Sequence, residues 1–157
     1  MITILIDGAS GSGKTTLGRE LAELTGFQLV HLDDFYPGWA GLAAASTMVA
    51  TDVLDPVRPG FTRYDWVGQK PADRVELHPR RSLIVEGAGA VTRASKAAAL
   101  RLGSVITVRL NAPEPMRRER ALARDPAYAP WWDMWAEQER IHFAGDGDVE
   151  VDHDLWL

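Results

Sequence analysis

The residues best suited to chemistry form a glycine-rich run near the start of the chain. Gly8 to Thr15 reads Gly-Ala-Ser-Gly-Ser-Gly-Lys-Thr and matches the pattern G-x-x-x-x-G-K-[ST] at every position. Its glycines permit backbone angles that point successive N–H groups into one cavity, where they bind phosphate oxygens. Lys14 adds a positive charge for the phosphates, and the Thr15 hydroxyl is a ligand for Mg²⁺. We therefore predict a site for ATP with Mg²⁺. The residues predicted to contact the nucleotide are Gly8, Ala9, Ser10, Gly11, Ser12, Gly13, Lys14, Thr15 and Thr16.

A second signal is an acid at the end of an apolar segment. Ser82 to Val85 has the pattern of a buried strand, and Glu86 follows it directly. In a parallel sheet this strand would lie near the strand that precedes the glycine run. We predict that Glu86 and Thr15 hold the metal, Glu86 through a bound water. An exposed acid that ends a strand is the plain alternative.

Two adjacent acids, Asp33 and Asp34, follow another short strand pattern at residues 28–31. A carboxylate at this edge could accept the proton of an acceptor hydroxyl as that hydroxyl attacks the γ-phosphate. Loops are often acidic, so a solvated turn is the alternative.

Arg117, Arg120 and Arg124 have the i, i+3, i+7 spacing of one helix face. We predict that guanidinium groups close over the transferred phosphoryl group; a solvated helix face is the alternative.

The elements that must position these residues alternate along the chain. The predicted strands cover residues 2–6, 28–31, 82–85, 104–110 and 148–151. The predicted helices cover residues 14–24, 41–54, 92–102, 113–124 and 131–143. This alternation predicts an α/β three-layer sandwich with a mainly parallel five-stranded sheet, as one domain over 1–157. Residues 36–81 are expected to form an acceptor-binding insertion with a hairpin of 61–66 and 74–77, and residues 113–130 an arginine lid.

Composition excludes several other classes of protein. The chain has 157 residues, 46% of them hydrophobic, and no cysteine, which excludes disulfides and thiolate catalysis and favours a cytoplasmic location. The net charge of −5 argues against nucleic-acid binding. No apolar run reaches the ~18–20 residues of a membrane helix, and the first residues lack the basic start of a signal peptide.

With these segments in hand, the chain resembles the uridine kinase and nicotinamide riboside kinase branch of the P-loop kinases. The resemblance lies in Asp7–Thr16, Leu32–Tyr36, Ile84–Gly87 and Arg120–Asp125. It implies a P-loop NTPase fold of the nucleoside and nucleotide kinase type. It also implies Asp33 as the base, Lys14, Arg120 and Arg124 as the groups that stabilise charge, and Tyr36 against the substrate ring.

A shorter segment extends the resemblance to the acceptor. Tyr64-Asp65-Trp66 is similar to the hairpin segment that holds the nucleobase in uridine kinases. The histidine that soon follows the hairpin tyrosine in that family has no counterpart here, where Gln69 stands nearby. Trp39 and Trp66 could stack on a flat substrate or pack in the protein, whereas packing is the better expectation for Trp131, Trp132 and Trp135.

These observations favour an ATP-dependent kinase for a hydroxyl of a nucleoside-like small molecule, acting as a monomer or homodimer. One alternative is a kinase of a nucleoside monophosphate, a shikimate-like or sugar-like acceptor, or an antibiotic. A phosphate-bearing acceptor would need further cations, for which Arg58, Arg63 and Arg74 are available. The alternative from another class is an ATP-binding regulatory module with no dedicated acceptor.

Overall fold

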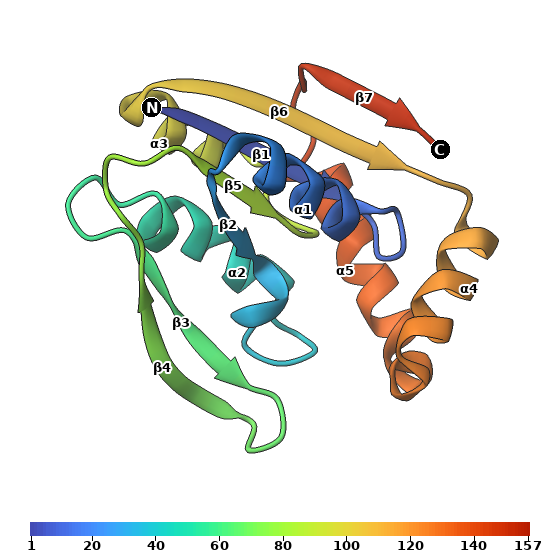
Figure 1. The fold of residues 1–157 in the computed structure, drawn as a ribbon. Helices are drawn as coiled ribbons and strands as arrows, with labels where there is room; N and C mark the ends of the chain where they lie inside the picture. The colour runs from blue at the N-terminus through green and yellow to red at the C-terminus, as the bar shows by residue number, and fades with distance from the viewer.

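The centre of the molecule is a parallel sheet. The computed structural model describes residues 1–157, and its five strands lie in the order β2-β5-β1-β6-β7, every pair parallel (Figure 1). They are β1 (Ile2–Gly8), β2 (Gln28–His31), β5 (Leu83–Glu86), β6 (Ser104–Asn111) and β7 (His153–Trp156). The predicted α/β fold with a mainly parallel five-stranded sheet is therefore confirmed.

Helices cover both faces of this sheet (Figure 1). Side chains alternate along each strand, so Ile4 and Ile6 pack with residues of α1 (Lys14–Thr25) on one face. Leu5 packs on the other face with residues of α2 (Leu42–Met48), α3 (Arg93–Leu102) and α5 (Trp132–Ala144). Leu5 and Ile6 are both 0% exposed. Because burial of such a side chain contributes roughly 1.5–3 kcal/mol, a continuous apolar strand with helices on both faces is the stable arrangement.

The helices begin and end at residues suited to those positions. Gly26, which follows α1, has φ 71°, and its N–H donates to the Ala22 carbonyl at 2.8 Å. Thr92 and Ser95 cap the start of α3 reciprocally through their side chains. Helix α4 (Glu114–Arg124) follows Pro113, and a 3₁₀ segment, Pro126–Trp131, leads into α5.

Residues 36–81 contain α2, a π-helical turn (Val49–Val53) and the predicted hairpin. Strand β3 (Gly60–Asp65) pairs antiparallel with β4 (Lys70–Glu76). The second strand is longer than predicted, because the turn is confined to residues 66–69. Asp65 shapes this turn, since its Oδ1 accepts hydrogen bonds from the N–H groups of Val67 and Gly68 at 3.0 and 2.9 Å.

The predicted strand at residues 148–151 is wrong. Val149 and Val151 alternate with acids as in a strand, but they pack against the core from an irregular segment. The ladder begins only after Asp152, whose Oδ2 accepts from the Thr107 N–H and hydroxyl at 2.8 and 2.9 Å. β7 then pairs with β6 over residues 153–156.

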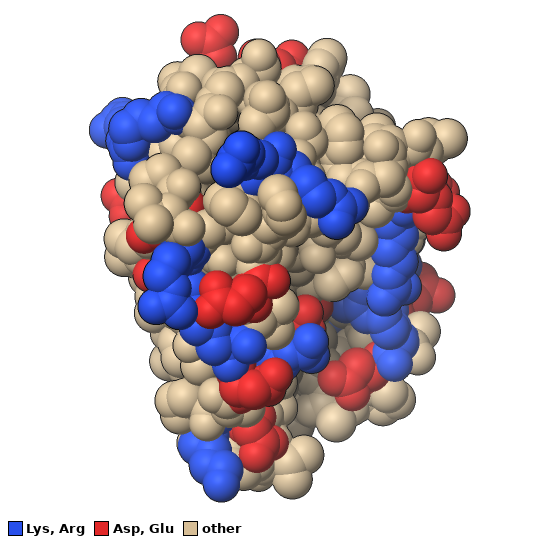
Figure 2. Space-filling model, turned by 60° about the vertical axis from the view of Figure 1, so that its left-hand side comes forward, with Lys and Arg blue, Asp and Glu red and all other residues tan.

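The surface carries charges of both signs. On the face in Figure 2, Lys and Arg side chains lie among Asp and Glu side chains. Two ion pairs of the hairpin region are Arg58–Glu76 at 3.2 Å and Arg63–Asp73 at 3.7 Å. No helix combines the length and the apolar composition that a transmembrane segment needs.

Candidate active site

The carboxyl ends of three neighbouring strands bring the predicted site together. In the ladder, Glu86 of β5 stands beside Ile6 of β1 and His31 of β2. The glycine run leaves β1 at this edge, and Asp33 lies in the 3₁₀ turn that follows β2. Parallel sheets bind ligands at this edge because the loops that leave it converge there.

The glycine run forms the backbone conformation that the motif predicts. Gly11 and Gly13 have φ values of 80° and 99°, which favour glycine. Gly11 is also pressed against α4, since a Cβ on it would lie 2.2 Å from the Arg117 carbonyl oxygen. Lys14 is 8% exposed, and its Nζ donates to the Ala9 carbonyl at 3.0 Å. The Lys14 ammonium is therefore held beside the start of the loop.

A cleft lies over this loop, and we call it the phosphate cleft. It has a volume of about 70 Å³. Its lining combines residues of the loop, the strand ends, α4 and α5. They are Ser10, Gly11, Gly13, Lys14, Thr15, Thr16, Asp33, Tyr36, Glu86, Gly87, Ala88, Arg124 and Trp135. The predicted base, metal acid, phosphate lysine and one predicted arginine thus share one cleft.

The two predicted metal ligands are in contact. Thr15 Oγ1 donates to Glu86 Oε1 at 3.1 Å, and Glu86 is 2% exposed. His31 Nδ1 also bonds to Glu86 Oε1, and this hydrogen bond raises the pKa of His31. A hydroxyl and a carboxylate are hard oxygen ligands, and Mg²⁺ commonly takes one or two carboxylates together with water and phosphate oxygens. The pair therefore fits the predicted ion.

The predicted base, Asp33, is exposed to the cleft. The surrounding protein displaces water from its carboxyl, and this desolvation, together with negative Glu86, raises the pKa of Asp33. Lys14 and Arg124 oppose the shift. Its backbone carbonyl accepts from Trp66 Nε1 at 3.1 Å, which ties the Asp33 turn to the hairpin.

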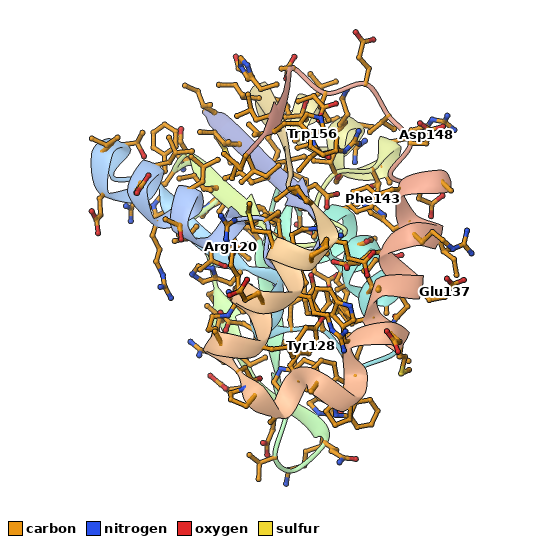
Figure 3. The ribbon with its side chains drawn as sticks, turned by 90° about the vertical axis from the view of Figure 1, so that its right-hand side faces the viewer. Arg120, Tyr128, Glu137, Phe143, Asp148 and Trp156 are labelled. Atoms are coloured by element: carbon orange, nitrogen blue, oxygen red, sulfur yellow. The ribbon has the colours of Figure 1, made fainter.

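The arginines of α4 divide into different environments. Arg124 lines the phosphate cleft. Arg117 is bound to the loop instead, because its Nη1 donates to the Ser10 carbonyl at 3.2 Å. Its Nε donates to the carbonyl of Ala112, just after β6, at 3.0 Å. Arg120 is exposed on α4 and does not line the cleft, so the structure does not bring it together with Arg124 there (Figure 3).

The predicted acceptor residues are placed differently from expectation. Tyr36 lines the cleft but is only 2% exposed, and its hydroxyl donates to the Ala88 carbonyl at 2.7 Å. Its ring meets Trp135 edge-on at 4.7 Å. Because the residue is almost fully buried, the ring offers no open face to a substrate ring. Tyr64, Asp65 and Trp66 do not line the cleft. One carboxylate oxygen of Asp65 is used by the hairpin turn.

The tryptophans form a contact between the hairpin and the segment after α4. Trp39 stacks on Trp131 with ring centroids 5.3 Å apart and planes at 5°, and it also contacts Trp66 at 5.1 Å. Trp132 and Trp135 are 2% and 6% exposed. Trp132 and Trp135 therefore pack in the protein as expected, whereas Trp131 is 41% exposed and contributes one face to the stack with Trp39. The same contact includes Trp66.

Sequence reasoning assigned no role to several buried polar residues of the site. Asp7, 0% exposed, accepts from the N–H groups of Gly8, Gly89 and Val91 at 2.7, 3.0 and 3.0 Å. His142 Nε2 lies 2.8 Å from Asp7 Oδ2. Glu139, one turn earlier on α5, is also buried. The sequence does hold one sign of these contacts. Residues 132, 135, 139 and 142 have the spacing of one helix face, and the polar pair Glu139 and His142 stands there beside two tryptophans.

Replacing His142 by Ala is expected to lower the free energy of unfolding by about 2–4 kcal/mol, because it removes the side-chain partner of the buried Asp7 carboxyl, which then keeps only its backbone N–H partners, and creates a cavity. Urea denaturation followed by circular dichroism measures this change. The control is His153→Ala, at an exposed position of β7, which should change stability by less than about 0.5 kcal/mol. Equal stabilities of the two variants would contradict the expectation.

Comparison with known proteins gives related sequences and folds. No protein-family model matches the chain. Shikimate kinase 2 of Yersinia pseudotuberculosis is 30% identical over 131 residues, which are 81% of this chain and 66% of that protein. Shikimate kinase 2 of Dickeya chrysanthemi is 40% identical over 60 residues, or 38% of this chain and 32% of that protein. The chain thus spans at most 66% of the length of these curated relatives.

Solved structures match nearly the whole chain. A sugar kinase from Janibacter superposes with a TM-score of 0.58 and 19% identity, over 100% of this chain and 84% of that one. A shikimate kinase from Bacteroides thetaiotaomicron gives 0.57 and 18%, over 98% and 85%. A possible uridine kinase from Bacillus stearothermophilus gives 0.55 and 17%, over 99% and 89%. The fold is that of the P-loop kinases. Among these neighbours, the uridine kinase branch is not singled out.

Proposed function

We propose that the protein is an ATP-dependent kinase that transfers the γ-phosphate to a hydroxyl of a small molecule. The observation that carries this proposal is the composition of the phosphate cleft, which unites Lys14, Asp33 and Arg124 with the contacting pair Thr15 and Glu86. A phosphate-binding loop alone serves nucleotide binding. A carboxylate open to the same cleft adds a group that can accept a proton during transfer.

In the proposed reaction the acceptor oxygen attacks the γ-phosphorus, and the bond from that phosphorus to the bridging oxygen of ADP breaks. Asp33 takes the proton of the attacking hydroxyl, while Lys14 and Arg124 stabilise the charge that spreads over the phosphoryl oxygens. Thr15 and Glu86 would hold Mg²⁺, which neutralises phosphate charge when bound.

We propose that the adenine of ATP occupies a second cavity beside the loop, which we call the side pocket. It has a volume of about 310 Å³ and combines aromatic walls with polar groups. Its lining residues are Ala9, Arg109, Leu110, Asn111, Ala112, Arg117, Phe143 and Trp156. Phe143 and Trp156 are labelled in Figure 3, on α5 and β7. An aromatic and guanidinium-lined cavity adjoining Ala9 suits a flat base attached to phosphates in the loop.

We infer that the acceptor is neutral, as a nucleoside or sugar is. Lys14 and Arg124 are the cations that line the phosphate cleft, and both are assigned to ATP. Arg58 and Arg74 pair with Glu76, and Arg63 pairs with Asp73, so the insertion adds no cation to the cleft. An acceptor that carries phosphate would find no further positively charged partner in the cleft.

We further propose that residues 36–81 receive the acceptor and that residues 113–130 act as the lid of a single kinase domain.

Shikimate is the second candidate acceptor, because the curated relatives are shikimate kinases with up to 40% identity. The same lack of a spare cation in the cleft disfavours its carboxylate. The cleft volume of about 70 Å³ is also below the ~300–1,000 Å³ of ordinary ligand pockets. Any acceptor, shikimate included, therefore needs the cleft to widen when it enters.

The test is ADP release from ATP–Mg²⁺ in the presence of nucleosides, nicotinamide riboside, sugars, shikimate, nucleoside monophosphates and aminoglycosides. We expect one neutral hydroxyl compound to raise the rate at least tenfold over the rate with ATP alone. Stimulation by shikimate would favour the second candidate. A rate indifferent to every acceptor, with ADP–Mg²⁺ still bound, would instead favour an ATP-binding regulatory module.

A further inference from the structure

Helix α5 reaches the phosphate loop through one buried carboxylate. Glu139 Oε2 accepts a hydrogen bond from the Ser10 N–H at 2.6 Å, across 129 residues of sequence. Glu139 is 3% exposed, so little water competes for this bond. A short bond to a carboxylate is roughly twice as strong as one between neutral groups.

The opposite side of Ser10 is held by another helix. The Ser10 carbonyl accepts from Arg117 Nη1 of α4 at 3.2 Å. Both backbone polar groups of Ser10 are thus bound by side chains from outside the loop. Gly11 follows with φ 80° and contacts the backbone of Arg117. The first half of the loop therefore has its orientation set by α4 and α5.

Helix α5 is itself fixed on both sides of Glu139. Gln138 Nε2 donates to the Trp39 carbonyl at 2.6 Å, and Gln138 Oε1 accepts from the Leu42 N–H at 3.3 Å. One turn later His142 bonds to Asp7 at 2.8 Å, just before the loop. These contacts hold the Glu139 carboxylate at a constant position relative to β1 and the loop.

We propose that Glu139 is a positioning residue for nucleotide binding, which holds Ser10 so that the phosphate loop is preorganised before the phosphates arrive. The inference rests on the proposed nucleotide site. A loop that is already ordered loses less conformational freedom on binding, and affinity rises accordingly. None of the motifs in the first 16 residues encodes this contact, because its acceptor lies near the other end of the chain.

The role of Glu139 as a hydrogen-bond acceptor can be separated from its negative charge. Burial raises the pKa of Glu139, while Lys14, the Ser10 N–H and Arg117 oppose that shift. A Gln side chain has nearly the same shape and keeps a carbonyl oxygen that accepts from the Ser10 N–H. The Glu139→Gln variant should therefore preserve the loop, whereas Glu139→Ala leaves the Ser10 N–H unbound.

The test measures the Kd for ADP–Mg²⁺ by isothermal titration calorimetry. We expect Glu139→Ala to raise Kd about tenfold and Glu139→Gln to stay within about threefold of the wild type. The matched control is Glu137→Ala on the same helix, where Glu137 is exposed (Figure 3). Its carboxylate pairs with Arg140. The control variant should bind as the wild type does. Circular dichroism checks that each variant is folded at the titration temperature.

A folded Glu139→Ala protein that binds ADP–Mg²⁺ as tightly as the wild type would overturn the inference. An equal rise of Kd in the Ala and Gln variants would also overturn it. Such a result would mean that the buried side chain only supports the packing, since Gln keeps the accepting oxygen and Ala does not. If the Ala variant does not fold, Glu139→Asp replaces it, since its shorter side chain cannot reach Ser10 and should also raise Kd about tenfold. Failure of the wild type to bind ADP–Mg²⁺ would instead reject the proposed function itself.

Discussion

Replacing Asp33 by Asn is expected to lower the acceptor-dependent rate by about 10²–10⁴-fold, the usual contribution of a general base. The substitution keeps the size of the side chain and the backbone carbonyl that accepts from Trp66 Nε1. The phosphate loop does not change, so ADP–Mg²⁺ should bind within about twofold of its wild-type affinity. Steady-state rates with the stimulating acceptor, together with calorimetric titration of ADP–Mg²⁺, separate the two effects.

The neighbouring acid supplies the control for this prediction. Asp34 follows Asp33 in the same 3₁₀ turn but does not line the phosphate cleft. Asp34→Asn removes the same charge and should leave the rate within about threefold of the wild type. Equal activity of the Asp33 and Asp34 variants would show that proton acceptance by Asp33 is not required.

The pH dependence of the reaction should carry the signature of the same base. Asp33 accepts a proton only when ionised, and the desolvation of its carboxyl by the surrounding protein, together with negative Glu86, raises its pKa above the ordinary carboxyl value. Activity is therefore expected at higher pH and should fall as the pH drops through this raised pKa. The acid limb of a plot of kcat/KM against pH should lie above 3.8, the ordinary value for Asp. An unchanged acid limb in Asp33→Asn would contradict the assignment.

Replacing Lys14 by Ala is expected to lower kcat by about 10²–10³-fold, the typical cost of removing one donor that stabilises transition-state charge. The ADP–Mg²⁺ affinity should also fall by at least tenfold, because a charged hydrogen bond contributes about 1.5–3 kcal/mol. This double loss distinguishes Lys14 from Asp33. Lys14 also donates to the Ala9 carbonyl, so the loop itself loses one contact. Rates and calorimetric titration measure both changes.

Lys70→Ala is the matched control for Lys14→Ala, because Lys70 is exposed at the start of β4. The substitution removes the same charge at a position away from the cleft. Its rate and affinity should match those of the wild type. Wild-type kcat with weakened binding in Lys14→Ala would mean that Lys14 binds the ground state and the transition state equally. Its proposed role in charge stabilisation would then be wrong.

Local sequence determined most of the sheet and the phosphate loop. A continuous apolar, β-branched run such as Ile2 to Ile6 is typical of a strand buried between two layers of helices. The prediction of a strand at 28–31 agrees with the structure at both ends. The conformation of the loop followed from its glycines, because positive φ is inexpensive only for them. Parallel pairing then brought Asp33 and Glu86 to the same edge, as expected from strand ends alone.

Other features were decided only when distant segments packed. The last strand was misplaced because alternating Val149 and Val151 suit a strand and an irregular core segment equally, and pairing with β6 chose residues 153–156. Arg120 and Arg124 are indistinguishable by spacing, and the packing of α4 left Arg124 alone of the two in the cleft.

The polar contacts of Glu139 and His142 near the phosphate loop were also decided only by the packing of distant segments. Glu139 and His142 had no recognisable motif, since a buried polar residue shows its purpose only through the partner it meets. That partner is the loop backbone for Glu139 and the Asp7 side chain for His142, each more than 120 residues away. The sequence by itself thus determined which groups are available to bind phosphate. Tertiary packing decided how the loop that binds it is held, because those contacts join segments that no local pattern relates.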